Sequence, residues 1–225
     1  MSAESFNPDT FDGIARLFPL PDLVFFPHVI QPLHIFEPRY RQMTADALAD
    51  NRLMALVQLR AGWDANDPSP PPIHSIACLG RIVAAQTLEQ GRYNLLLQGV
   101  SRIRIVEELS CDKPYRNARV ELLDDQPCAS ARTEAALRRK LSKRMPVWFP
   151  TKAGVMEQFQ KLVDSDLSLG ALCDIFSFAL PLDSQFKQTL LEELDVKKRV
   201  RALLRQMETN SSLPDRKFPP EFSSN

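Results

Sequence analysis

The sequence has few glycines, no excess of either charge and no long apolar run. Each of these features argues against a class of partner, location or catalytic motif. Lysine plus arginine equals aspartate plus glutamate, 28 against 28, so the net charge does not point to nucleic acid or an anionic membrane as the main partner. No apolar stretch approaches the roughly 18 residues that span a bilayer, and no secretory signal peptide is recognisable at the N-terminus. The sequence therefore predicts a soluble, cytoplasmic protein that does not enter the membrane.

Cysteines are also few, and none is placed for a metal site or a disulfide. Cys78, Cys111, Cys128 and Cys173 are widely separated, and no two of them form the C-x-x-C pair of structural zinc sites. A chain of 225 residues is long enough to bury a hydrophobic core without disulfides. We therefore expect free thiols in a reducing compartment and no bound metal.

The common catalytic motifs are missing as well. None of the seven glycines is followed by lysine, so the G-x-x-x-x-G-K-[ST] loop that cradles ATP phosphates is absent. His34 in "HIFE" has no second histidine at the H-E-x-x-H spacing of zinc peptidases. "GVSRI" lacks the second glycine of G-x-S-x-G, and Ser101 is predicted to be a turn residue between two strands. We expect no catalytic residue and no cofactor, and keep an uncharacterised hydrolase as an alternative.

The first half of the chain, residues 14–123, has the patterns of strands broken by prolines. "LMALVQLR" (53–60) is a compact apolar run typical of a buried strand, and "RNARVELL" (116–123) is a further strand. In "RIRIVE" arginine alternates with isoleucine, the period of a half-buried strand. Gly91 in "EQGR" is predicted to supply the positive φ of a hairpin turn. These patterns predict five to seven strands in one curled antiparallel or mixed sheet.

In the second half, residues 130–207, the apolar period becomes helical. Asp183 and Asp195 are placed to cap the last two predicted helices. The polar, proline-rich tail of residues 208–225 is predicted to be disordered or loosely draped. The apolar stripes predict the core of a helical bundle: Leu137, Leu141 and Met145; Val155, Phe159, Leu162 and Val163; Leu169, Leu172, Cys173 and Phe176; Phe186, Leu190, Leu191 and Leu194; Val196, Val200, Leu203, Leu204 and Met207.

Between the predicted strands, "HIFEPRYR" has the pattern of a joint where a strand becomes a helix. Pro38 suits the first turn of a helix, because its missing N–H is no loss there. Glu37 lies near the positive end of the helix dipole and stands four residues before Arg41, which predicts an ion pair. The predicted buried stripe of this helix is Tyr40, Met43, Ala47 and Leu48.

Three segments in this order resemble a known family. "LFPLPDLVFFPHVIQPLHIFEPRYRQM", "GRYNLLLQGVSRIRI" and "ALPLDSQFKQTLLEELDVKKRVRALLRQM" are similar to the N-terminal substrate-binding domain of Lon proteases. The similarity runs from about Arg16 to Met207, and the wording "IFEPRY" is closer to that of stand-alone bacterial LON-domain proteins. It implies an α+β fold, with a PUA-like β pseudo-barrel (14–123) followed by a C-terminal helical bundle (130–207).

The resemblance also implies a function. LON domains bind unfolded or degron-bearing protein segments, which suggests an adaptor or regulator in protein quality control, acting with a Lon-type protease. The ATPase loop is absent, and the Ser-Lys protease domain that follows in Lon is not found before Asn225. We therefore expect a non-catalytic protein that binds proteins or peptides.

Four side chains are candidates for that binding. Arg39 and Tyr40 could line a groove of the β-rich half, while Trp148 and Phe149 in "PVWFP" could line a cleft between the halves. Arginine and aromatic residues dominate protein recognition sites, although packing is the more common role for each of these four side chains.

RNA is the alternative partner, because PUA-like barrels include RNA-binding proteins. Because the net charge is neutral, we interpret the basic runs as solvated faces and prefer a protein partner to nucleic acid. The basic residues concerned are Arg102, Arg104, Arg116 and Arg119 on candidate strands, Arg138, Arg139, Lys140, Lys143 and Arg144 on one helix, and Lys197, Lys198, Arg199, Arg201 and Arg205 on the last helix.

Overall fold

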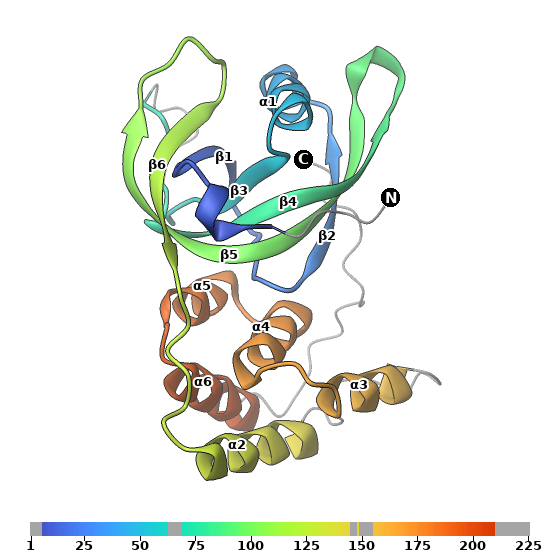
Figure 1. Ribbon diagram of the computed structural model, residues 1–225, viewed down its shortest axis with the longest axis vertical. Helices are drawn as coiled ribbons and strands as arrows, with labels where there is room; N and C mark the ends of the chain where they lie inside the picture. The colour runs from blue at the N-terminus through green and yellow to red at the C-terminus, as the bar shows by residue number, and fades with distance from the viewer. Residues whose placement is uncertain (1–5, 63–68, 145–147, 149–154, 210–225) are drawn as a thin grey trace. The chain divides into compact units, whose positions relative to one another are not determined.

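The computed structural model describes residues 6–62, 69–144, 148 and 155–209, which form two compact units (Figure 1). The first unit contains the strands and helix α1 and extends to Leu123. The second begins at Asp124 and contains helices α2 to α6. Apart from α1, the strands precede the helices along the chain, and the predicted α+β class is confirmed.

Six strands form one mixed sheet in the first unit. The long fifth strand, β5, allows the sheet to close into a ring. One edge of β5 pairs with β4, while the other edge is shared by two strands. The first half of that edge pairs with β2 and the second half with β6. The strands are β1 (Ile14–Leu20), β2 (Ile30–Ile35), β3 (Leu53–Gln58), β4 (Ile76–Thr87), β5 (Tyr93–Leu109) and β6 (Arg116–Leu123).

The sheet closes into a ring because β6 also pairs with β1. β1 runs parallel to β3, and β3 pairs with β4, so β5, β4, β3, β1 and β6 form a closed pseudo-barrel. A parallel pair needs a crossover connection, which here contains β2 and α1. The inside of the ring holds a buried apolar cluster, which comprises Ala15, Leu17, Leu53, Ala55, Val57, Ala77, Leu79, Ile103, Ala118 and Val120.

A second apolar layer lies on the outer face of β1 and β3. All six residues of β3 are buried, so both of its faces are covered, as the run "LMALVQLR" predicted. Phe18 of β1 pairs in register with Leu56 of β3, and its ring packs on that of Tyr40 from α1. Helix α1 therefore covers this face of the barrel.

The predicted hairpin turn is confirmed, whereas the predicted turn at Ser101 is wrong. Gly91 has a φ of +70° in the connection between β4 and β5. Ser101 lies inside β5, which continues without a turn. The glycine near it, Gly99, serves a close backbone approach instead, because an ideal Cβ there would lie 2.1 Å from the carbonyl oxygen of Phe26.

"HIFEPRYR" is a strand-to-helix joint, as predicted. Helix α1 (Pro38–Ala49) begins directly after Glu37, with proline in its first turn. The predicted pair between Glu37 and Arg41 is wrong: Glu37 pairs with Arg39 at 3.0 Å, and the guanidinium of Arg41 donates to the carbonyl oxygen of Gln90. The buried side chains of α1 are Tyr40, Met43, Thr44 and Ala47, so Thr44 takes the place predicted for Leu48, which is half-buried.

The described residues of the second unit form five helices. Both predicted caps are confirmed: Asp183 accepts from the backbone N–H groups of Gln185 and Phe186, and Asp195 accepts from that of Lys198. The buried stripe of the last helix is as predicted, while Leu194 lies beyond the end of the preceding one. The helices are α2 (Ala131–Arg144), α3 (Val155–Val163), α4 (Leu169–Ala179), α5 (Ser184–Glu192) and α6 (Val196–Thr209).

The prediction that Arg199 belongs to a solvated face is wrong. Its side chain is 0% exposed and donates two hydrogen bonds to the carboxylate of Asp125, at 2.9 and 2.5 Å. Its Nε lies 3.3 Å from a carboxylate oxygen of Asp174. Burial alone would lower the pKa of Arg199, but these two carboxylates more than compensate and raise it. The arginine is therefore a charged part of the interior of the helical unit.

Arg138 departs from its prediction in the same way. Its guanidinium donates to the backbone carbonyl oxygens of Val163 and Ser165, at 2.9 and 3.3 Å, and to that of Leu167. It therefore holds the end of α3 and the turn after it, instead of facing water. Most of the predicted tail lies outside the described residues, except that Glu208 and Thr209 belong to α6.

Candidate functional site

The β unit contains a cavity of about 640 Å³, called here the aromatic pocket. Its walls come from β1, the start of α1, the segment before β4 and the connection between β5 and β6. The lining residues are Phe18, Pro19, Leu20, Pro21, Glu37, Arg39, Tyr40, Leu59, Ser69, Pro70, Pro71, Pro114, Tyr115 and Arg116.

An aromatic pair forms the floor of the aromatic pocket. The ring centroids of Phe18 and Tyr40 are 4.3 Å apart, with an angle of 50° between the planes. Arg39 places its guanidinium 4.5 Å from the ring centroid of Tyr40 and keeps about half of its side chain exposed, at 54%. Burial raises the pKa of Tyr40, so its hydroxyl remains protonated at neutral pH. The floor is therefore an uncharged apolar surface with one cation at its rim.

Five prolines stiffen the walls of the pocket. They offer no backbone N–H, and their fixed φ angles limit how far the walls can rearrange. Arg116 ties one of these walls to the sheet, because it donates to the carbonyl oxygen of Pro71 at 2.8 Å and pairs with both carboxylate oxygens of Glu108. The prolines are Pro19, Pro21, Pro70, Pro71 and Pro114.

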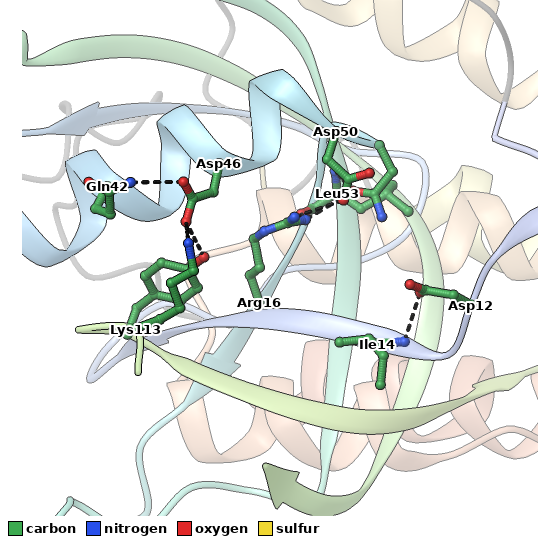
Figure 2. A network of polar contacts seen from close by, with 10 residues as sticks. Asp12, Ile14, Arg16, Gln42, Asp46, Asp50, Leu53 and Lys113 are labelled. Carbon is green, nitrogen blue, oxygen red and sulfur yellow. Dashed lines mark hydrogen bonds and ion pairs between the residues drawn. The ribbon is translucent and has the colours of Figure 1, made fainter. Parts of the chain in front are cut away.

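A polar network holds Tyr115 in the wall opposite Tyr40, and Figure 2 shows the charged members of this network. The hydroxyl of Tyr115 donates to Asp46 of α1 at 2.6 Å, and the same carboxylate accepts from Lys113 at 2.8 Å and from Gln42 at 2.8 Å. Chiefly through the hydrogen bond from Lys113, the network lowers the pKa of Asp46 to about 2. Burial, with the bond to Asp46, raises the pKa of Tyr115 to about 12.

A second set of contacts anchors β1 to the end of α1. Arg16 pairs with Asp50 at 2.8 Å and donates to the side-chain oxygen of Asn51 at 3.1 Å and to the carbonyl oxygen of Leu53 at 3.4 Å (Figure 2). The ion pair lowers the pKa of Asp50. Because α1 and β1 carry Tyr40 and Phe18, these contacts hold the floor of the pocket in place before any ligand arrives.

The family of the chain follows from its sequence profile. The profile described as the ATP-dependent protease La (LON) substrate-binding domain matches residues 14–209. The chain belongs to this family. Its relatives include the Lon protease of Dictyoglomus thermophilum, 28% identical over 83% of this chain, and Lon protease 2 of Myxococcus xanthus, 26% identical over 88%. The chain spans only 23% and 24% of the lengths of these two relatives, so the match does not extend to their other parts.

Solved structures share the fold of this LON domain. The N-terminal domain of the Mycobacterium avium complex Lon protease aligns with a TM-score of 0.64 at 17% identity, covering 87% of this chain and 98% of that one. A Lon N-terminal domain protein from Xanthomonas campestris aligns with a TM-score of 0.60 at 20% identity, covering 85% of this chain and 97% of that one. The predicted pseudo-barrel followed by helices is thereby confirmed.

Two of the four predicted contact residues of the LON domain lie together at the pocket. Arg39 and Tyr40 both line it, although Tyr40 is only 5% exposed. Trp148 belongs to the helical unit and is 6% exposed, while Phe149 lies outside the described residues. A binding role for any of the four stays a prediction.

Most residues of the pocket have no distinctive signal in the sequence. Phe18 and Tyr115 gave no signal, since their strand and loop positions fit ordinary packing. The proline-rich stretches "PLP" and "SPPP" were visible, but proline there indicated only where strands end. Among the described residues, no group of three or more His, Cys, Asp or Glu could hold a metal ion, and no helix is long and apolar enough to cross a membrane.

Proposed function

We propose that this LON domain binds extended, unfolded segments of other proteins by taking an apolar or aromatic side chain into the aromatic pocket, without catalysing a reaction. The observation that carries the proposal is the cavity of about 640 Å³ over the Phe18–Tyr40 pair. Its volume is in the range of sites that hold small ligands or single large side chains. The cellular form of the proposal is an adaptor or regulator in cytoplasmic protein quality control, working with a Lon-type protease.

The charges at the rim support an apolar ligand. Arg39 is paired with Glu37, and Arg116 is paired with Glu108, so both cations at the pocket already have an anionic neighbour. An acidic ligand would compete with those carboxylates, whereas burial of an apolar side chain releases water without breaking either pair. Both tyrosines keep their hydroxyl protons at neutral pH, which fits a binding surface.

The strand arginines favour peptide over RNA as the ligand of the β unit. Arg102 is only 3% exposed, so it cannot reach a phosphate. The other three arginines named as an RNA-binding surface each pair with a glutamate: Arg104 with Glu121, Arg116 with Glu108 and Arg119 with Glu107. Phosphate binding relies on cations that can replace the counterions of the nucleic acid, and these three already have anionic partners.

The test is photo-cross-linking with peptides from unfolded proteins that carry a photoreactive phenylalanine analogue. Mass spectrometry is expected to map the cross-links to residues 18–21, 69–71 and 114–116, which line the pocket. Single-stranded RNA serves as the parallel ligand. Cross-links spread over the surface, or retention of RNA without peptide, would contradict the proposal.

Variants then separate binding from folding. Tyr40→Leu, with Arg39→Ala at the rim, is expected to weaken peptide binding about tenfold, in line with the loss of an aromatic contact and a cation. Arg104→Ala, an exposed arginine away from the pocket, is the matched control and should leave the affinity unchanged. Urea unfolding of each variant shows whether the fold survives.

A further inference from the structure

The helical unit contains a cavity of its own, of about 760 Å³, called here the basic groove. It lies along α2 and α6, which have 14 residues each. Helices of that length measure about 20 Å, enough to accommodate roughly six residues of extended chain. Its cationic lining residues are Arg132, Lys140, Lys143, Arg144, Arg201 and Arg205.

Most cations of the basic groove make no ion pair within the described part of the chain. Arg144 pairs with Glu208 at 3.0 Å, and Glu208 is the one acidic residue among the described lining residues. The other five cations make no ion pair with any residue that the structure describes. Arginines around the aromatic pocket are, by contrast, neutralised. Several unpaired cations along one concave surface create a positive potential that favours an anionic ligand.

The base of the groove is apolar. Ala136 and Leu137 of α2 and Leu204 of α6 line it, and the two leucines are 5% and 8% exposed. A ligand that follows the groove therefore meets an apolar strip between two rows of positive charge. No aromatic side chain is among the described lining residues.

We propose that the basic groove is a second binding site, which takes an acidic segment of another protein that has apolar side chains between its carboxylates. The carboxylates pair with the cations of α2 and α6, and the apolar side chains rest on Leu137 and Leu204. This arrangement matches the ligand to both features of the groove. Nucleic acid matches only one, because single strands bind by stacking on aromatic side chains as well as by phosphate contacts.

The experiment uses the full chain and a fluorescein-labelled twelve-residue peptide of alternating glutamate and leucine, followed by fluorescence anisotropy at moderate salt. Two matched peptides replace all glutamates by glutamine or all leucines by serine, and a single-stranded RNA of the same length is the fourth ligand. Each replacement is expected to weaken binding about tenfold, since each removes one of the two complementary features. The RNA is expected to bind more weakly than the original peptide.

Charge reversal locates the site. Lys140→Glu with Arg201→Glu changes one exposed cation on each helix and is expected to weaken peptide binding at least about tenfold through like-charge repulsion. Arg139→Glu is the matched control, because Arg139 is exposed on α2 but does not line the groove, and the affinity should change by less than about twofold. Lys140→Gln with Arg201→Gln should give an intermediate loss.

Three outcomes would overturn the proposal. Equal binding of the glutamine peptide would show that charge is not recognised, and equal loss in Arg139→Glu would show that the groove is not the site. RNA binding that is tighter than peptide binding, and lost in the double charge reversal, would assign the groove to nucleic acid.

Discussion

The two units of this LON domain differ in where their ion pairs lie. In the β unit, Arg102 is buried at 3% exposure, but ion pairs such as Lys113–Asp46 lie at the periphery, where the two side chains are 49% and 21% exposed. In the helical unit, a charged pair lies in the interior, with Arg199 and Asp174 exposed by 0% and 1%. The same chain therefore uses two methods to define a fold.

The difference follows from how each unit is held together. Register in the barrel is set by backbone ladders and by the alternation of apolar side chains, so the apolar cluster inside it needs no ion pair to fix the strands. The helical unit has short helices, and its entry segment must be fixed to them. Asp125 in this segment pairs with Arg199, and the neighbouring Gln126 exchanges backbone hydrogen bonds with Leu194 and Val196. A buried arginine thus joins the entry segment, α4 and α6 at one point.

The largest expected effect is that of Arg199→Leu. The change removes the cation that pairs with Asp125 and with the buried Asp174, so we expect the free energy of unfolding of the helical unit to fall by about 3–5 kcal/mol. Urea unfolding followed by Trp148 fluorescence measures it in a Trp63→Phe background, where Trp148 is the remaining tryptophan. Arg205→Ala, exposed on the same helix, should change the value by less than about 0.5 kcal/mol. A loss below about 1 kcal/mol for Arg199→Leu would remove the contrast between the units.

Arg138→Ala should have the next largest effect. It removes the donor for three backbone carbonyl oxygens after α3, so we expect a loss of about 2 kcal/mol. Arg139→Ala, the next residue on the same helix, is exposed and should cost less than about 0.5 kcal/mol. Both are measured in the same tryptophan background. Equal values for the two variants would mean that Arg138 is a surface residue after all.

These two arginines also mark the limit of what the sequence could predict. Local spacing predicted strands in the first half of the chain and helices in the second, together with the buried stripe of α6 and both aspartate caps. Arg138 and Arg199 lie in runs of basic residues that look uniform along the chain. Their acceptors are 25 and 74 residues away, at Val163 and Asp125, so no local pattern distinguishes them from their solvated neighbours.

The same limit applies to the aromatic pocket. Arg39 and Tyr40 were predictable as candidates because "FEPRYR" is a local motif. Phe18 and Tyr115 were not, because they reach the pocket only when β1 and the β5–β6 connection fold against α1. Gly99 shows the same dependence. A side chain at this position would collide with the backbone of Phe26, which lies more than seventy residues earlier in the chain.

Gln58→Leu should stabilise the β unit. Gln58 is 2% exposed, and neither polar atom of its side chain has a hydrogen-bond partner within the described part of the chain. Replacing an unsatisfied buried amide by a side chain of similar size is expected to raise the free energy of unfolding by about 1 kcal/mol, measured by urea unfolding followed by circular dichroism. Gln188→Leu is the matched control, because Gln188 is equally buried at 1% but donates to Glu192 at 2.9 Å. Gln188→Leu should destabilise the protein. If both changes stabilised it, the missing hydrogen bonds of Gln58 would not explain the effect.

The smallest effect is expected at the periphery of the barrel, with Asp46→Asn. The pKa of Asp46 is lowered to about 2 in the folded state, so the folded protein favours the carboxylate, and the resulting stability is present above pH 4 and lost as the pH falls toward 2. Because the carboxylate is partly exposed, solvent screening limits this contribution to about 1 kcal/mol.

Urea unfolding at a series of pH values checks the expectation. The difference in free energy of unfolding between the wild-type protein and Asp46→Asn should be about 1 kcal/mol at pH 7 and should shrink as the pH falls from 4. Glu121→Gln, at a pair whose side chains are 50% and 60% exposed, should change stability by less than about 0.5 kcal/mol at pH 7. If the Asp46→Asn difference stayed constant with pH, the network in Figure 2 would stabilise the wall of the pocket by packing and not by charge.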